Sequence, residues 1–131
     1  MNRLKKIIGF ILLCFQTSAS FSQGVTGDFK VHSSIDTNAI LIGQQTWFSL
    51  KTDIPAGNSV SWPVLNDSLT GQIEIIKKTK IDTAYSTDKS RVFLSQRFNI
   101  TSFDTGFLVI PPMRFQFNND STNFAETEPI L

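Results

Sequence analysis

The sequence predicts an all-β protein, an antiparallel β-sandwich of about seven short strands. In several segments apolar and polar residues alternate with a period of two, and these segments are rich in Phe, Ile and Thr. Asn, Asp, Gly and Pro separate the segments and supply turns. After residue 23, no segment repeats apolar residues at positions i, i+3, i+4 and i+7, as a helix packed on a core would.

Residues 1–23 predict a helical signal peptide. Basic residues come first, residues 7–15 are almost wholly apolar, and small and polar residues follow. About nine apolar residues are too few for a hydrocarbon core roughly 30 Å thick, so we expect export to the periplasm. Cys14 is the only cysteine, and Leu13 precedes it where lipid attachment requires a small residue. The exported chain is therefore expected to contain no thiol.

Residues 24–131 are expected to form one exported domain whose stability comes from packing alone. Without Arg3, Lys5 and Lys6, 9 basic residues face 11 acidic ones, a formal charge of −2. Nucleic acids and acidic membrane surfaces do not attract a weakly acidic domain, so we expect neither as a partner.

Three strands are predicted in the first part of this domain: around Phe29 and Val31, over residues 46–52 and over residues 59–62. In the second strand, Phe48 and Leu50 are expected to point to the core and Trp47 to the opposite face. Pro and Gly interrupt the rest of residues 53–69, so no longer strand is expected there.

Residues 72–81 predict a strand at a sheet edge, followed by a polar turn over residues 82–90. Ile73, Ile75 and Ile81 share one parity, and lysines are concentrated between Ile75 and Ile81. Lysines on an exposed edge discourage pairing with another sheet, which favours the edge position.

The strongest strand pattern covers residues 91–100, and two further strands follow later in the chain. The apolar residues on the inner face of the first are Val92, Leu94, Phe98 and Ile100. Met113, Phe115 and Phe117 then alternate with polar residues, a turn is expected at residues 118–120, and a last strand begins at Thr122.

The stretch FDTGFLVIPP, residues 103–112, predicts a structural corner. In immunoglobulin-like domains an Asp-x-Gly-x-Tyr corner precedes strand F, where the acid holds the turn and the glycine adopts a conformation that a Cβ forbids. Asp104 and Gly106 match these positions, and Phe107 replaces the tyrosine and retains only its packing role. Pro111 and Pro112 are expected to end a strand, because proline cannot donate to a ladder. The predicted sandwich is therefore immunoglobulin-like.

The sequence contains no catalytic or cofactor-binding motif that we can identify. His32 is the only histidine, which excludes a histidine-based zinc site within one chain. There is no Gly-x-Ser-x-Gly elbow, no phosphate-binding loop and no calcium-loop spacing of acids. Asp104 has no second titratable group within its motif. We expect no enzymatic activity, metal or cofactor; a hydrolase would require His32 beside an acid and a serine.

Two groups of residues are candidates for contact with sugars. Trp47 and Trp62 would form a stacking platform if both were exposed on one face, although a sandwich core normally takes at least one tryptophan. Three Asp-Ser/Thr-x tripeptides resemble bacterial O-glycosylation sites and fall in predicted turns. Their acceptor residues are Ser68, Thr83 and Ser121.

Residues 35–44, 73–83 and 100–112 resemble, in their order and spacing, the N-terminal immunoglobulin-like domain of BatD-like envelope proteins of so-called aerotolerance operons. The resemblance covers about residues 33–131. It implies a periplasmic domain whose partners are von Willebrand A-type membrane proteins and a cytoplasmic AAA+ ATPase. Such proteins also have a later transmembrane helix, so this chain is expected to be an N-terminal fragment cut near its last strand.

The sequence therefore predicts a non-catalytic, periplasmic protein-binding or scaffold domain of a cell-envelope protein. It would contact a membrane only through the signal peptide or a C-terminal anchor outside this sequence. A secreted carbohydrate-binding module is the alternative function. No interface residues are indicated.

Overall fold

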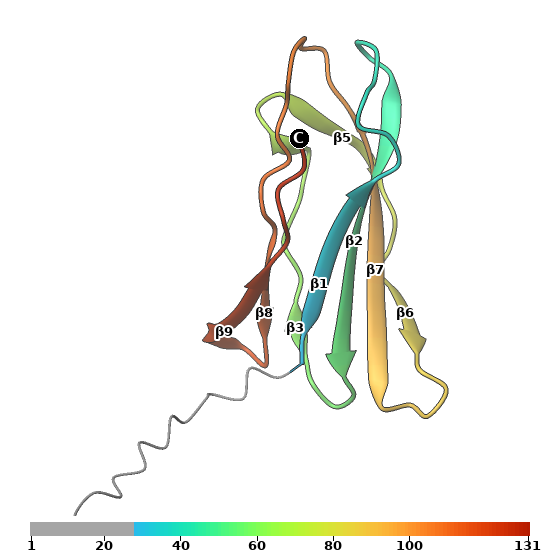
Figure 1. The fold of residues 1–131 in the computed structure, drawn as a ribbon, viewed down its shortest axis with the longest axis vertical. Helices are drawn as coiled ribbons and strands as arrows, with labels where there is room; N and C mark the ends of the chain where they lie inside the picture. The colour runs from blue at the N-terminus through green and yellow to red at the C-terminus, as the bar shows by residue number, and fades with distance from the viewer. Residues whose placement is uncertain (1–27) are drawn as a thin grey trace, which may run out of the picture.

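The computed structural model describes residues 28–131, which form two antiparallel sheets packed face to face (Figure 1). The predicted signal peptide lies outside the described residues. The all-β sandwich is confirmed, with nine strands among the described residues. They are β1 (Lys30–Ile35), β2 (Gln45–Pro55), β3 (Val60–Ser61), β4 (Ser68–Thr70), β5 (Ile73–Lys78), β6 (Asp82–Tyr85), β7 (Arg91–Thr101), β8 (Arg114–Phe117) and β9 (Asp120–Glu126). Between residues 28 and 131, no helix is long and apolar enough to cross a membrane.

The strand order is that of a constant-type immunoglobulin sandwich. The larger sheet has the order β1-β2-β7-β5-β4, and β6 also pairs with β7; the smaller sheet has the order β3-β8-β9. If β1, β2, β3, β5, β7, β8 and β9 are named A to G, the two sheets become A-B-E-D and C-F-G. β4 and β6 are additions to the larger sheet. The expectation that the sequence is cut near its last strand concerns residues beyond Leu131 and stays a prediction.

The core lies between the inner faces of the two sheets, and the predicted alternation in β2, β7 and β8 is confirmed. Phe48 and Phe98 from the larger sheet and Phe115 and Phe117 from the smaller one are almost completely buried. Trp62, after β3, meets the Phe115 ring edge-on, with 5.0 Å between the ring centroids. Aromatic side chains thus fill much of the core.

Two expectations for residues 72–90 are wrong. The predicted strand ends at Lys78 instead of residue 81, with a bulge between Ile75 and Lys77, and Ile81 lies exposed beyond its end. Residues 82–85 are not part of a turn but form β6, which pairs with β7 from Asp82 to Tyr85. β7 is longer than β5, so part of its edge is left to pair with β6. The polar residues 82–85 have a weak strand propensity, which pairing with β7 overrides.

The predicted edge position of β5 holds for its lysine half only. β4 pairs with Ile73 and Glu74. On the side where β4 lies, no described strand pairs with Lys77 and Lys78. On the other side, both residues pair with β7.

Candidate functional site

The candidate site lies at the upper end of the sandwich, as drawn in Figure 1. Two long loops meet there: residues 36–44 between β1 and β2, and residues 102–113 between β7 and β8. Within the second loop, an isolated bridge joins Ile110 to Ile130, close to the C-terminus. We call this region, with Leu131, the upper end; the turns at the opposite end form the lower end.

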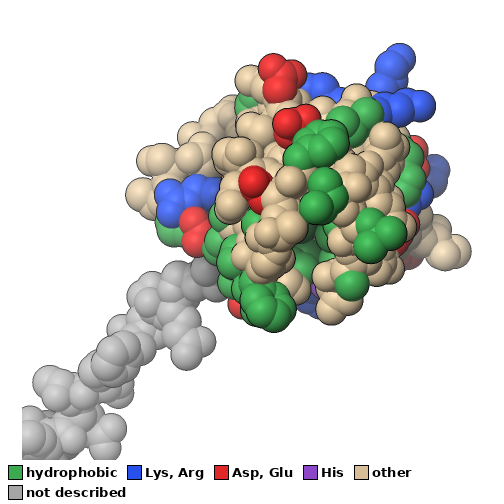
Figure 2. Space-filling view, turned by 90° about the horizontal axis from the view of Figure 1, so that it is seen from above, with side chains coloured by type: hydrophobic (Ala, Val, Ile, Leu, Met, Phe, Trp, Pro, Cys, Tyr) green, Lys and Arg blue, Asp and Glu red, His purple; other side chains and the backbone are tan. Residues whose placement is uncertain are grey.

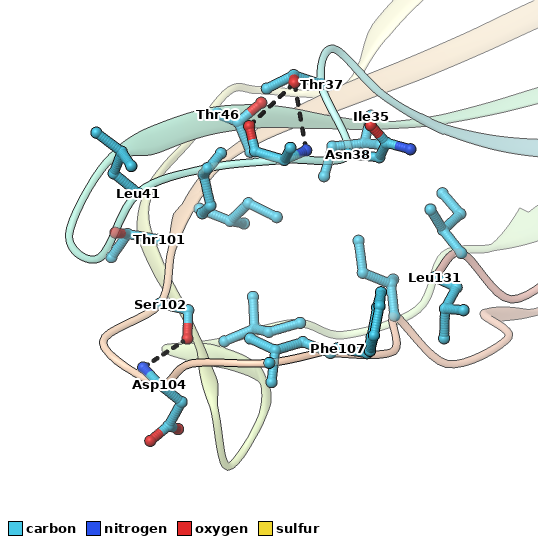
Figure 3. A pocket seen from close by; sticks show the side chains of 18 residues that line it. Ile35, Thr37, Asn38, Leu41, Thr46, Thr101, Ser102, Asp104, Phe107 and Leu131 are labelled. Atoms are coloured by element: carbon cyan, nitrogen blue, oxygen red, sulfur yellow. Dashed lines mark hydrogen bonds between the residues drawn. The ribbon is translucent and has the colours of Figure 1, made fainter.

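A cavity of about 310 Å³ lies between the two loops. Its deeper wall is aliphatic and includes Ile73, Ile100 and Ile110, which also belong to the buried core. Figure 3 shows the two loops on opposite sides of the cavity, with Leu41 and Thr37 on one and Asp104 and Phe107 on the other. The volume is at the lower limit of common ligand pockets, roughly 300–1,000 Å³.

Most hydroxyl groups around the cavity have partners within the protein. Thr37 Oγ1 donates to the carbonyl of Ala39 at 3.2 Å, and Thr101 Oγ1 donates to the carbonyl of Gln44 at 2.9 Å. Ser102 Oγ accepts a hydrogen bond from the amide of Asp104 at 3.1 Å. These bonds hold the two loops in place beside the cavity.

Thr46 is the exception. It lines the cavity, only 4% of its surface is exposed, and its Oγ1 is buried without a hydrogen-bond partner among residues 28–131. An unsatisfied buried hydroxyl costs about 1–3 kcal/mol of folding free energy and is uncommon in native proteins. The cavity therefore contains one polar atom that could bond to a bound molecule.

Large apolar side chains are exposed at the upper end, and three of them, Leu41, Phe107 and Leu131, line the cavity. Phe107 is 92% exposed and Leu41 is 78% exposed. The other exposed apolar residues of these loops and the C-terminus are Ile42, Phe103, Val109 and Leu131. Figure 2 views the molecule from this end and shows hydrophobic side chains distributed over it. We call these six residues the apolar rim; a gathering of this kind usually marks an interaction surface.

The predicted corner at residues 103–112 differs from expectation. Gly106 has φ of +101°, a conformation that favours glycine. However, no group among residues 28–131 donates a hydrogen bond to the Asp104 carboxylate, and Phe107 projects into solvent instead of packing. The reason is loop length: β8 begins only at Arg114, so Phe107 lies far from the start of strand F.

Pro111 and Pro112 do not end a strand as predicted. The segment before them contains only the bridge at Ile110, and the prolines lie in the loop that leads to β8. Proline lacks the amide needed for a ladder, which is consistent with the absence of strand pairing at these two positions.

The two tryptophans do not form a shared platform, and at least one lies against the core, as a sandwich normally requires. Trp62 packs against the core. Trp47 alternates with buried Phe48 and lies on the outer face of the larger sheet, where the Arg97 guanidinium is 4.7 Å from its ring centroid. Arg97 also forms an ion pair with Asp36 at 3.0 Å. The indoles belong to different sheets and point to different environments.

The three candidate glycosylation residues, Ser68, Thr83 and Ser121, are all exposed. They lie in β4, β6 and β9, not in the turns that we expected. Their modification stays a prediction.

His32 is exposed on β1, opposite Lys51 on β2. Within residues 28–131, no acid or serine forms a hydrogen bond or ion pair with it, so the arrangement that a hydrolase would require is not found there. The described part of the chain also contains no group of three His, Cys, Asp or Glu side chains placed to hold a metal ion.

Sequence reasoning missed Thr46 and the apolar rim as site residues. Thr46 resembles any inward-facing strand residue, and its missing partner is visible only after folding. The run of apolar residues at 39–42 outside a strand pattern was the available signal for the rim. Comparison of the chain with protein-family models, curated protein sequences and solved structures finds no match.

Proposed function

We propose that this chain is a non-catalytic protein-binding domain of a bacterial cell-envelope protein and that its upper end is the binding surface. The observation that carries the proposal is the apolar rim, six exposed large side chains at the upper end, of which Leu41, Phe107 and Leu131 line its cavity. Burying such side chains against a partner is favourable by roughly 25 cal/mol per Å² of apolar surface. A protein surface is a suitable occupant because it can cover both loops at once.

A binding role is supported over an enzymatic one by the chemistry of the site. Among residues 28–131, Asp104 is the only ionisable side chain that lines the cavity; the other lining residues are apolar or hydroxylic, apart from the amide of Asn38. General acid and base catalysis normally uses at least two groups held in each other's reach. The alternative carbohydrate-binding function loses its main support, because Trp47 and Trp62 do not share a face.

The setting of the proposal comes from the resemblance to BatD-like envelope proteins. It places the domain in the periplasm and makes von Willebrand A-type membrane proteins the proposed partners. An apolar surface of such a partner would contact the upper end, while the polar lower end would remain in solvent.

Site-specific photo-crosslinking in the source cells tests the proposal. A photoreactive phenylalanine analogue replaces Phe107 in the whole exported chain, and a matched variant carries it at Tyr85, which is 64% exposed on β6. We expect an adduct with a von Willebrand A-type membrane protein from position 107 and none from position 85. Equal adducts from both positions, or none from position 107, would contradict the proposal.

A further inference from the structure

The cavity at the upper end has the properties of a binding site for one particular kind of side chain. Its deeper wall is aliphatic, so a polar or charged group would lose hydration there without gaining partners. Its volume of about 310 Å³ has room for a bulky side chain together with part of the adjoining backbone. The exposed rim residues Leu41 and Phe107 lie on opposite loops and would cover the residues next to it.

The Thr46 hydroxyl specifies one polar contact. Thr46 shares the parity of Phe48 and Leu50 on β2, so its side chain points between the sheets toward the cavity that it lines. A hydroxyl can donate to a carbonyl oxygen, and the backbone of an extended peptide presents such an oxygen at every residue. A peptide segment whose carbonyl reached this buried hydroxyl would thus satisfy an atom that the free protein leaves without a partner.

Asp104 adds a negative charge at the mouth of the cavity. It is exposed, lines the mouth of the cavity, and forms no ion pair with a basic residue of the described chain. A lysine or arginine beside the aliphatic residue of a partner would face this carboxylate.

From these three features we propose that the cavity receives a leucine-like side chain of an extended partner segment. The carbonyl of that segment accepts a hydrogen bond from Thr46 Oγ1, and an adjacent basic side chain faces Asp104. This inference rests on the proposed function and names the chemistry of the partner at its point of contact.

Peptide titration tests the ligand chemistry with the exported chain labelled with ¹⁵N. The probe is a capped hexapeptide of glycine and serine with one central leucine followed by lysine. We expect it to shift the amide signals of Ala39, Thr46 and Leu108. Replacing its leucine by serine should weaken binding roughly tenfold or more, and replacing its lysine by glutamate should weaken it about threefold. Absence of shifts at millimolar peptide overturns the inference.

A pair of matched substitutions tests the role of the hydroxyl. Thr52 lies on the inner face of the same strand, and its Oγ1 is also buried without a partner, but it does not line this cavity. Thr46→Val and Thr52→Val should both raise Tm, since each removes an unsatisfied hydroxyl. Only Thr46→Val should weaken binding of the leucine–lysine peptide, by about threefold to tenfold. Equal affinities of the two variants would overturn the hydrogen bond and with it the inference.

Failure of this inference can be distinguished from failure of the proposed function. If crosslinking from position 107 persists while the peptide titration is flat, the cavity inference is wrong and the upper end is still the binding surface. If position 107 gives no adduct with a von Willebrand A-type protein while the peptide binds as described, the cavity inference holds and the proposed partner is wrong.

Discussion

The connections between strands differ at the two ends of the sandwich. At the lower end, short polar turns bond to one another: Asn118 Nδ2 donates to Asn58 Oδ1 at 2.8 Å, and the amide of Ser59 donates to Asn118 Oδ1 at 2.9 Å. At the upper end, long loops expose the apolar rim and leave the Thr46 hydroxyl without a partner. The turns of the lower end are therefore tied together by polar bonds, whereas the upper end exposes apolar side chains and lines its cavity with a hydroxyl that has no partner among the described residues.

Charged groups strengthen the contrast. Near the lower end, Arg91 donates to the carboxylates of both Asp28 and Asp53, and its hydrogen bond to Asp53 raises the pKa of Arg91. At the upper end, Asp104 has no ion-pair partner among the described residues. The difference indicates that the turns of the lower end stabilise the fold, whereas the exposed rim side chains of the upper end contribute little to stability.

The strongest test compares an aromatic residue from each end. Phe117, at the end of β8, is fully buried and stacks on Phe29, with 4.0 Å between the ring centroids. Phe117→Ala should lower the free energy of unfolding by about 3–5 kcal/mol, because it removes apolar burial and leaves a cavity. Phe107→Ala should change it by less than about 0.5 kcal/mol. Urea unfolding followed by tryptophan fluorescence measures both; a loss for Phe107→Ala comparable with that for Phe117→Ala would break the comparison.

The turn between β8 and β9 gives a smaller effect. Asn118 and Asn119 have φ of +54° and +55° and form a two-residue hairpin turn, in which asparagine and glycine are favoured. Asn118→Ala should destabilise the domain by about 2 kcal/mol, through left-handed strain and the loss of its side-chain hydrogen bonds.

Asn119→Gly is the matched control for this turn. Glycine adopts positive φ without strain, so the variant should be as stable as the parent or up to about 0.5 kcal/mol more stable. Thermal and urea unfolding measure both variants. If Asn118→Ala were neutral, the lower turns would not be the stabilising end that we describe.

The smallest effect concerns acid pH. Hydrogen bonds from the hydroxyls of Ser86 and Ser90 and from the Ser90 amide lower the pKa of Asp88 from 3.8 to about 2. A lowered carboxyl pKa stabilises the fold above the ordinary value of 3.8, and this contribution is lost as the pH falls from 3.8 to about 2. Asp88→Asn should therefore lower Tm at pH 7, and the difference from the parent should disappear near pH 2.

A direct titration sharpens this prediction. NMR of the Asp88 carboxyl should give a pKa of about 2 in the parent chain. Ser86→Ala removes the largest cause of the shift, so it should raise the pKa of Asp88 toward 3.8. A Tm difference between parent and Asp88→Asn that stays constant from pH 7 to pH 2 would contradict the prediction. It would show that the negative charge of Asp88 does not stabilise the turn between β6 and β7.

Local sequence predicted much of the fold but little of the candidate site. The alternation that places Phe48, Phe98 and Phe115 in the core was readable because strand parity depends only on neighbouring residues. The turn at residues 118–119 was readable for the same reason, since asparagine tolerates positive φ. The strand predicted over residues 72–81 ends at Lys78, and a bulge between Ile75 and Lys77 breaks its alternation, which parity alone does not reveal.

The errors at the candidate site have a common cause. Phe107 matched a corner motif, but its exposure depends on the course of a long loop that the motif does not determine. Trp47 and Trp62 were candidates for a shared platform, and only the assembly of two sheets placed one outside and the other against the core. A motif specifies local chemistry, whereas the surroundings of a side chain come from distant segments.

By itself, the sequence determined the class of the fold, because a period of two with turn residues between short segments makes one face of each strand apolar. It also determined which residues that face contains in β2, β7 and β8. Only the tertiary structure decided that β6 pairs with the free part of β7, that two loops expose their apolar residues at one end, and that the Thr46 hydroxyl lacks a partner. Each of these depends on contacts between residues far apart in the chain, which local patterns do not encode.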